Sequence, residues 1–266
     1  STLSPSSAAS DVYKRQERTL APEKVAFTDN IIINKKLAQP YIAVDDVSGI
    51  RFKGNKVQLS KNYSAPGFIT EKVKVPQLPD NTVIRKDKGA SWFTNQVAQS
   101  TTNVHKECNV SPGTNLSEIV HSLEPGSIII LSKGTYPIQR SILIDKPLTI
   151  RAADPGNKPL IRFNGDKLDN MVTIADGGEL KIENIAFDGV LEPGKALAKA
   201  GISTAFDMIQ PYTLTVDGCE FQNFGEGGFF AIKGTKATFA KSVTIRNCFF
   251  RDLSGDAINY AAEKDD

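Results

Sequence analysis

Leu180-Lys-Ile-Glu-Asn-Ile-Ala-Phe187 is the first of three segments that align with one another without a gap. The other two are Leu214-Thr-Val-Asp-Gly-Cys-Glu-Phe221 and Val243-Thr-Ile-Arg-Asn-Cys-Phe-Phe250. Apolar residues occupy positions 1, 3, 6 and 8 of each segment, and position 5 is Asn or Gly. Alternation over the first positions predicts a strand, and Asn or Gly permits the left-handed backbone of a tight corner. Each segment is therefore predicted to form a strand, a corner and a second strand.

This unit returns along the chain every 25 to 34 residues. The three segments begin 34 and 29 residues apart, and Leu148-Thr-Ile150 lies 32 residues before the first. Near the N-terminus, Val25-Ala-Phe-Thr-Asp-Asn-Ile-Ile32 aligns with Ile50-Arg-Phe-Lys-Gly-Asn-Lys-Val57 at an offset of 25. A unit of this length cannot bury its apolar face alone, so successive units must stack. The sequence predicts an all-β fold, a right-handed parallel β-helix.

An antiparallel β-sandwich is the main structural alternative. It would need hairpin signals every 8–12 residues, and it would not require the same corner three times. In a β-helix, equivalent side chains stack inside the solenoid, which predicts two inward ladders: Ile182, Val216 and Ile245, and Phe187, Phe221 and Phe250. Cys219 and Cys248 share a repeat position. Side chains in register point in parallel, which suits a disulfide poorly, so we expect a core stack of small apolar residues.

The pattern divides the chain into four parts. Residues 1–16 lack apolar periodicity, and we interpret them as disordered, non-native sequence resembling translated adapter. Residues 17–78 are predicted to be closing coils of an N-terminal β-helix, and the polar residues 79–114 a linker. Residues 115–266 are predicted to be a second β-helix, truncated at its C-terminus. Its first element is expected to be a short helix with apolar residues at 116, 119, 120 and 123 behind a Thr or Asn cap, covering the open end of the solenoid.

Composition excludes several classes of function. The 266 residues carry a formal net charge of +2, close to balance, which gives no support for nucleic acid as a partner. No run of about 18 apolar residues exists, so no membrane-spanning helix is expected. Three cysteines and two histidines are too few for a disulfide scaffold, a four-ligand zinc site or a multi-histidine centre.

Two stretches of the second part resemble a known superfamily. Leu123-Glu-Pro-Gly-Ser-Ile-Ile-Ile-Leu-Ser-Lys-Gly-Thr-Tyr136 and Leu148-Thr-Ile-Arg-Ala-Ala-Asp-Pro155 look like the opening of a pectin-lyase-like solenoid. A β-helix tail, a Gly89-Ala-Ser-Trp92 exit, a linker and a fresh capped β-helix together resemble two-domain family 6 polysaccharide lyases, which include alginate lyases and chondroitinase B. Ala90 replaces the proline of that family's usual exit segment.

The resemblance implies β-elimination on a uronic-acid polymer, alginate first among them, by a secreted or periplasmic bacterial enzyme. It implies Ca²⁺ as the cofactor, a lysine as base and an arginine as acid partner. The family builds that set on middle coils of its N-terminal domain, so we expect the catalytic residues upstream of this chain. No Ca²⁺ site is identifiable in residues 1–266, and the oligomeric state stays open.

Candidate binding residues follow from outward strand positions. Arg51 and Lys53, with Lys24 and Lys56, form a basic strip that suits a polyanionic sugar chain; the alternative is an ordinary solvated face. Tyr212, Phe229 and Phe230 lie off the repeated ladders, where they face either a sugar or a packed loop. Asp45-Asp46 supplies too few oxygens for Ca²⁺ and is expected to form a turn.

Two other classes of function use the same fold. One is a non-catalytic β-helix, an adhesin or carbohydrate-binding protein. The other is a pectin-type glycoside hydrolase, which needs two or three carboxylates gathered on one face. Fold alone does not separate these three classes.

Overall fold

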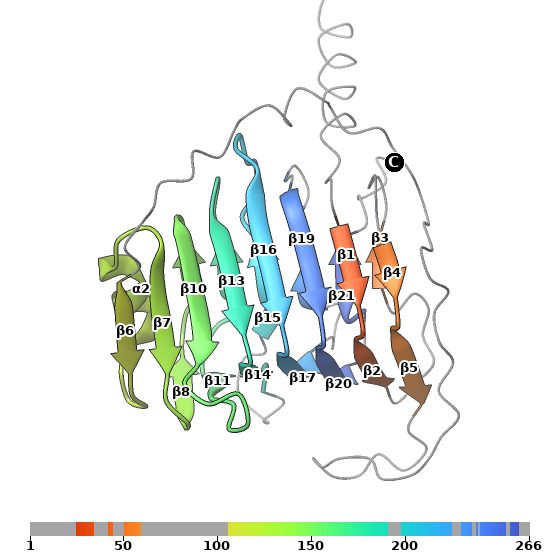
Figure 1. The fold of residues 1–266 in the computed structure, drawn as a ribbon, viewed down its shortest axis with the longest axis horizontal. Coiled ribbons are helices and arrows are strands. Elements are labelled where there is room, and N and C mark those ends of the chain that lie inside the picture. The colour runs from red at the N-terminus through yellow and green to blue at the C-terminus, as the bar shows by residue number, and fades with distance from the viewer. Residues whose placement is uncertain are drawn as a thin grey trace, which may run out of the picture.

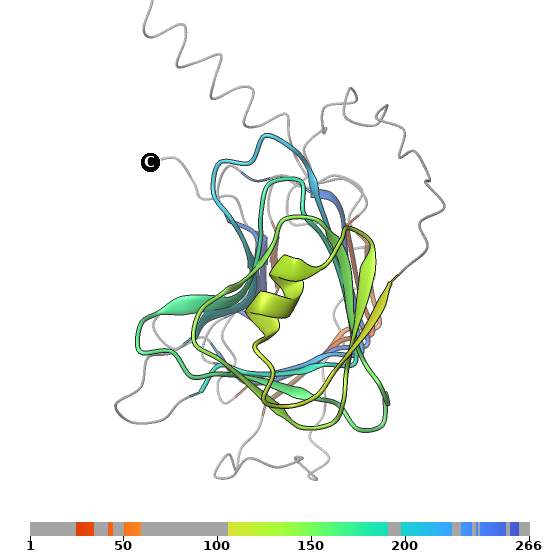
Figure 2. The same ribbon diagram turned by 90° about the vertical axis from the view of Figure 1, so that its left-hand side faces the viewer.

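The fold is a stack of parallel coils, seen in a computed structural model that describes residues 25–34, 42–44, 51–59, 106–190, 198–224, 230–235, 238, 240–253 and 256–260. Three parallel sheets run along the stack, and each coil contributes a strand to each sheet in turn (Figure 1). Viewed along the stack, the sheets enclose a three-sided core (Figure 2). The predicted parallel β-helix is confirmed. Among the described residues, no helix has the length and apolar character needed to cross a membrane.

The strands are grouped here by sheet, in spatial order. Sheet A consists of β6 (Glu107–Val110), β7 (Ser127–Leu131), β10 (Pro147–Ala152), β13 (Glu179–Glu183), β16 (Tyr212–Asp217), β19 (Ala240–Arg246), β1 (Val25–Thr28) and β4 (Arg51–Lys53). Sheet B consists of β8 (Thr135–Ile138), β11 (Leu160–Phe163), β14 (Ala186–Asp188), β17 (Glu220–Phe224), β20 (Phe249–Leu253), β2 (Ile31–Asn34) and β5 (Lys56–Leu59). Sheet C consists of β9 (Ile142–Ile144), β12 (Asp169–Ile174), β15 (Ala198–Thr204), β18 (Phe230–Lys233), β21 (Ile258–Tyr260) and β3 (Ile42–Val44).

The predicted inward ladders form the core. Ile182 pairs with Val216 and Val216 with Ile245, and all three side chains are fully buried. Phe187, Phe221 and Phe250 are likewise paired in sequence along sheet B, with ring centroids 4.9 and 5.2 Å apart and nearly parallel planes. Burying a Phe side chain contributes about 1.5–3 kcal/mol, so such ladders supply much of the stability that one coil alone lacks.

The corner between sheets A and B has the backbone that the repeat predicted. Asn184, Gly218 and Asn247 adopt φ values of 56°, 63° and 56°. Asp29 and Gly54, at the same position of the N-terminal coils, adopt 56° and 66°. A Cβ at Gly218 would lie 2.4 Å from Asn184 Oδ1, so a larger residue there would force the Asn184 side chain to move.

A short helix covers the first coil, as predicted. Helix α2 (Leu116–Ser122) is capped by Asn115, whose side-chain oxygen accepts a hydrogen bond from the Ser117 N–H at 3.1 Å. It buries Leu116 and Val120 and lies across the open end of the solenoid (Figure 2). Apolar residues at helical spacing therefore cover the core at the end where it would meet water.

The N-terminal coils occupy a place that the sequence analysis did not anticipate. We expected residues 17–78 to close a separate β-helix, whereas β1, β2 and β3 pair in parallel with β19, β20 and β21. The described coils thus form one continuous solenoid, with the strands of residues 25–34, 42–44 and 51–59 stacked beyond the coil that ends at 260 (Figure 1). Residues 107–110 of the expected linker form β6, the first strand of sheet A. Residues 1–16 and Trp92 lie outside the described residues.

Two buried asparagines join the N-terminal coils to the rest. On each coil, the residue that follows the left-handed corner position points into the core and is buried. Along the stack, from β16 to β4, this residue is Cys219, Cys248, Asn30 and Asn55. Asn30 Nδ2 donates to the Ile245 carbonyl at 3.1 Å, and Asn30 Oδ1 accepts from the Cys248 N–H at 3.1 Å. Asn55 Oδ1 accepts from Asn30 Nδ2 at 2.9 Å, and Asn55 Nδ2 donates to the Phe27 carbonyl at 2.7 Å. These amides satisfy backbone groups of neighbouring coils that water cannot reach.

We predict that Asn30→Ala lowers the free energy of unfolding by about 2–4 kcal/mol, because it leaves buried backbone groups without partners and opens a cavity. Denaturant unfolding followed by circular dichroism measures this change. Asn109→Ala, which removes an exposed amide on the outer face of β6, is the matched control and should stay within about 0.5 kcal/mol of the parent. Equal stabilities for both variants would show that the N-terminal coils are not seated on β19–β21 in solution.

Candidate functional site

The outer face of sheet A carries a row of polar side chains that runs from coil to coil. Strand pairing fixes the row, because each residue lies beside its equivalent on the next strand. From β4 to β10, its members are Lys53, Thr28, Arg246, Asp217, Glu183 and Arg151. A second row, two residues earlier on each strand, consists of Arg51, Ala26, Thr244, Thr215, Lys181 and Thr149. We call these two rows the sheet A face.

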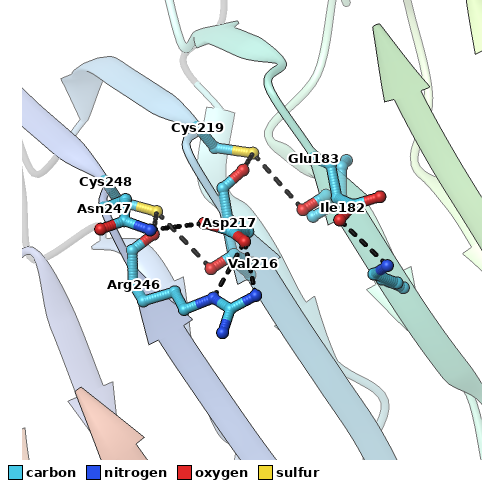
Figure 3. A network of polar contacts seen from close by, with 9 residues as sticks. Ile182, Glu183, Val216, Asp217, Cys219, Arg246, Asn247 and Cys248 are labelled. Carbon is cyan, nitrogen blue, oxygen red and sulfur yellow. Dashed lines mark hydrogen bonds and ion pairs between the residues drawn. The ribbon is translucent and has the colours of Figure 1, made fainter. Parts of the chain in front are cut away.

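Asp217 is the centre of the polar network on this face (Figure 3). Its Oδ2 accepts hydrogen bonds from Arg246 Nε at 2.9 Å and Nη2 at 2.7 Å, and its Oδ1 accepts from Asn247 Nδ2 at 2.8 Å. Hydrogen bonding and the nearby charge of Asp217 raise the pKa of Arg246 above its usual range. The Arg246 guanidinium therefore stays charged, and both oxygens of the carboxylate are already occupied.

Two further carboxylates on the outer side of sheet A, Glu183 and Glu107, are also paired. Lys181 Nζ lies 3.0 Å from Glu183 Oε1, and Arg151 Nη2 lies 3.3 Å from Glu107 Oε1. The side chains of Lys181 and Glu107 are about half exposed, so each pair contributes only about 0–1 kcal/mol to stability. Their main effect is local neutralisation of charge along β6, β10 and β13.

Arg51 and Lys53 lie where the sequence placed them, exposed on the outer face of β4. Within the described residues, neither makes an ion pair; the corner residue Asp29, beside Gly54, makes none with Lys53. The Cα atoms of Arg51 and Lys53, two residues apart on one strand, are separated by about 6.6 Å. The structure brings them onto the same face as Arg246 and Asp217, which the sequence analysis did not single out. The repeat alignment contained that signal, since all four occupy positions 2 or 4 of the unit.

The aromatic candidates divide between the core and the surface. Tyr212 is buried at the start of β16, and burial raises its pKa well above 10. It packs in the core and does not face a ligand. Phe230 is half-buried, with Lys233 Nζ 4.8 Å from its ring centroid. Lys24, Asp45, Asp46 and Phe229 lie outside the described residues, as does the side chain of Lys56.

The stacked cysteines are part of the core, as expected. Cys219 and Cys248 are buried free thiols on successive coils. Cys219 Sγ contacts the Ile182 carbonyl at 3.7 Å, and Cys248 Sγ contacts the Arg246 carbonyl at 3.2 Å (Figure 3). Burial raises the pKa of Cys219 to about 12 and that of Cys248 well above 9. Both are therefore neutral thiols at ordinary pH and unsuited to nucleophilic catalysis.

The sheet A face does not fit Ca²⁺. Among the described residues, no three His, Cys, Asp or Glu side chains gather as metal ligands. Ca²⁺ takes six to eight oxygens, whereas Asp217 and Glu183 are engaged by Arg246, Asn247 and Lys181. We therefore derive no step through a metal on this face. What it offers is charged and hydroxyl groups that bind carboxylates and sugars.

The fold and this geometry can be compared with known proteins. The family model described as "Domain of unknown function (DUF4957)" matches residues 134–264. No curated protein matches the chain. Among solved structures, the family 6 alginate lyase AlyGC and an arginine-to-alanine mutant of it each match at 21% identity, with a TM-score of 0.50.

Each alignment covers 86% of this chain and 34% of the lyase. The chain thus spans about a third of the length of these enzymes. At this identity the likeness shows a shared fold, the parallel β-helix of family 6 alginate lyases.

We predict that only Cys108 of the three thiols reacts with Ellman's reagent in the folded protein at pH 8, and that all three react in denaturant. Cys108 is half-buried on the first strand of sheet A, whereas the other two are enclosed. Because the fold favours the neutral thiols of Cys219 and Cys248, their contribution to the free energy of unfolding is complete below about pH 9. This contribution is lost as pH rises toward the raised pKa values. Reaction of three thiols without unfolding would contradict the inward placement.

Proposed function

We propose that this chain is part of a polysaccharide lyase acting on a uronic-acid polymer, with alginate as the first candidate substrate, and that the sheet A face binds the polymer. The fold shared with family 6 alginate lyases supports the class of protein. One observation carries the binding role: Arg51 and Lys53 are exposed cations side by side on a face where the carboxylates Asp217, Glu183 and Glu107 are already paired.

The charge distribution supports a polyanion as the ligand. Paired carboxylates repel an incoming anion far less than free ones, and guanidinium and ammonium groups hydrogen-bond carboxylates at short distance. Thr28, on β1 between β19 and β4, and Thr244, two residues before Arg246 on β19, add hydroxyl groups suited to sugar oxygens. A uronate chain lying across β19, β1 and β4 would meet Arg246, Thr28 and Lys53 at successive strand spacings of about 4.8 Å.

The elimination chemistry belongs, in this proposal, to residues outside this chain. A base must remove the proton beside a carboxylate whose charge is neutralised. On the sheet A face, the ammonium of Lys181 is paired with Glu183 and the guanidinium of Arg246 with Asp217, so neither is poised as base or acid. Ca²⁺ as the neutralising cofactor is likewise proposed for the longer protein, and so is a location outside the cytoplasm, where a polymeric substrate is found.

We predict that Arg51→Glu combined with Lys53→Glu weakens binding of oligomannuronate by tenfold or more. Isothermal titration calorimetry at low salt measures the affinity, and raising the salt concentration should weaken binding to the parent, because the attraction is electrostatic and exposed. The parent chain and the double variant are compared at the same pH.

The matched control is Lys167→Glu combined with Lys199→Glu. Lys167 is exposed just before β12, and Lys199 is exposed on β15; both strands belong to sheet C. The change in net charge equals that of the Arg51→Glu and Lys53→Glu variant. The control should bind as the parent does. Equal losses in the two double variants would mean that net charge alone drives binding and would remove the sheet A face from the proposal.

We also predict that purified residues 1–266 do not cleave alginate, with or without Ca²⁺. Elimination creates an unsaturated uronate that absorbs in the ultraviolet, so the reaction is followed by absorbance. The longer protein containing this sequence should produce that absorbance. Turnover by the isolated chain that is lost on changing Lys181 or Arg246 would place the active site on the sheet A face instead.

A further inference from the structure

Sheet B carries a second group of polar side chains on its outer face, at the ends of four successive strands. We call it the sheet B cluster: Arg162, Asp188, Gln222, Asn223, Arg251 and Asp252. Pairing places Arg162 beside Asp188, Asp188 beside Gln222, and Gln222 beside Arg251. The row runs along the stack and lies on a different side of the solenoid from the sheet A face (Figure 2).

Two stacked bulges each add one outward side chain to this cluster, on β17 and on β20. On β17, Phe221 and Phe224 are both buried, although regular alternation would place them on opposite faces. Asn223, between Gln222 and Phe224, adopts φ 63° and resets the alternation. On β20, Asp252 adopts φ 59° and does the same between Arg251 and the buried Leu253. The coils of β17 and β20 thus each present two adjacent polar groups, Gln222 with Asn223 and Arg251 with Asp252, a use of bulges that re-aims side chains.

Asp188 is held rigidly within the cluster. It lies on the outer side of sheet B, yet it is only 7% exposed. Its Oδ1 accepts from Asn223 Nδ2 at 2.7 Å and from the Val190 N–H at 3.0 Å, and its Oδ2 lies 3.6 Å from Arg162 Nε. Val190 adopts φ 59°, which is unusual for a β-branched residue and is found where the surroundings impose it.

The charges of the cluster cancel. Arg162 is adjacent to Asp188, Arg251 Nε lies 4.0 Å from Asp252 Oδ2, and Arg251 Nη2 donates to Gln222 Oε1. Two guanidinium groups and two carboxylates give no net attraction for a polyanion, unlike Arg51 and Lys53. What remains is an array of planar groups that both donate and accept hydrogen bonds, in which Asp188 is buried and Gln222, Asn223 and Arg251 are half-buried.

We propose that the sheet B cluster binds a neutral sugar unit. Adjacent hydroxyl groups of a pyranose donate and accept at once, as carboxylate, carboxamide and guanidinium groups do in complementary fashion. The bulges set two such groups side by side on β17 and again on β20, and these two strands are neighbours about 4.8 Å apart. Gln222, Asn223 and Arg251 are half-buried and so remain reachable by a ligand. This inference is independent of polyanion binding on the sheet A face.

The test compares two asparagines with the same backbone. Asn223→Gly removes an amide of the cluster, while glycine retains the positive φ without strain. Asn184→Gly makes the same change at φ 56° on the corner between sheets A and B, outside the cluster. Each variant is titrated by calorimetry with cellotetraose, mannotetraose and xylotetraose as neutral probes and with tetramannuronate as the acidic probe. Thermal unfolding verifies that both variants are folded.

We expect the parent to bind at least one neutral tetrasaccharide, Asn223→Gly to weaken that binding about tenfold, and Asn184→Gly to leave it unchanged. A second variant, Arg251→Ala, should weaken the same binding. Arg51→Glu with Lys53→Glu should affect tetramannuronate alone, which separates this site from the sheet A face. Absence of neutral binding in the parent, equal losses in both asparagine variants, or loss of neutral binding in the Arg51 and Lys53 variant would each overturn the proposal.

Discussion

Everything in this protein depends on parallel pairing of each coil with the next in one register. The register is set at the corner between sheets A and B, where a single residue with positive φ turns the chain. Because Asn184, Gly218, Asn247, Asp29 and Gly54 all make that turn at the same point, the strands on both sides of the corner remain aligned. A shift of one residue would move Phe221 from the core to the surface and Gln222 into the core. The corner therefore specifies the fold, and the apolar ladders stabilise it.

A change of chemistry inside that corner marks where the N-terminal coils join. Cys219 and Cys248 fill the inner position with neutral thiols, whereas Asn30 and Asn55 fill it with amides. An amide buried without partners would be costly, but Asn30 bonds to Ile245 and Cys248 on one side and to Asn55 on the other. The two asparagines stabilise only the arrangement in which their coils are neighbours. An apolar ladder can stack on almost any other coil, whereas Asn30 and Asn55 favour the particular neighbouring coils that satisfy their hydrogen bonds.

The sequence predicted what depends on local periodicity. The strand–corner–strand unit, the ladders through Val216 and Phe221, and the helix at Leu116 all follow from spacing within one coil. It did not predict that β1 pairs with β19, because the inward pattern of one coil suits the edge of any other. Outward alternation placed Arg51 and Lys53 correctly on one face. The bulges at Asn223 and Asp252 were missed, since a residue that resets alternation looks, in sequence, like a break in the pattern.

The outer faces, unlike the core, differ from sheet to sheet, and pairing of charges explains what each can attract. On sheet A, the ion pairs of Asp217, Glu183 and Glu107 remove negative charge that would otherwise repel an anionic polymer. The positive potential that remains comes from Arg51 and Lys53, at the end of the sheet built by the N-terminal coils. The joint at Asn30 therefore has a consequence beyond stability. By stacking β1 and β4 on β19, it brings two exposed cations onto a face whose own charges already cancel.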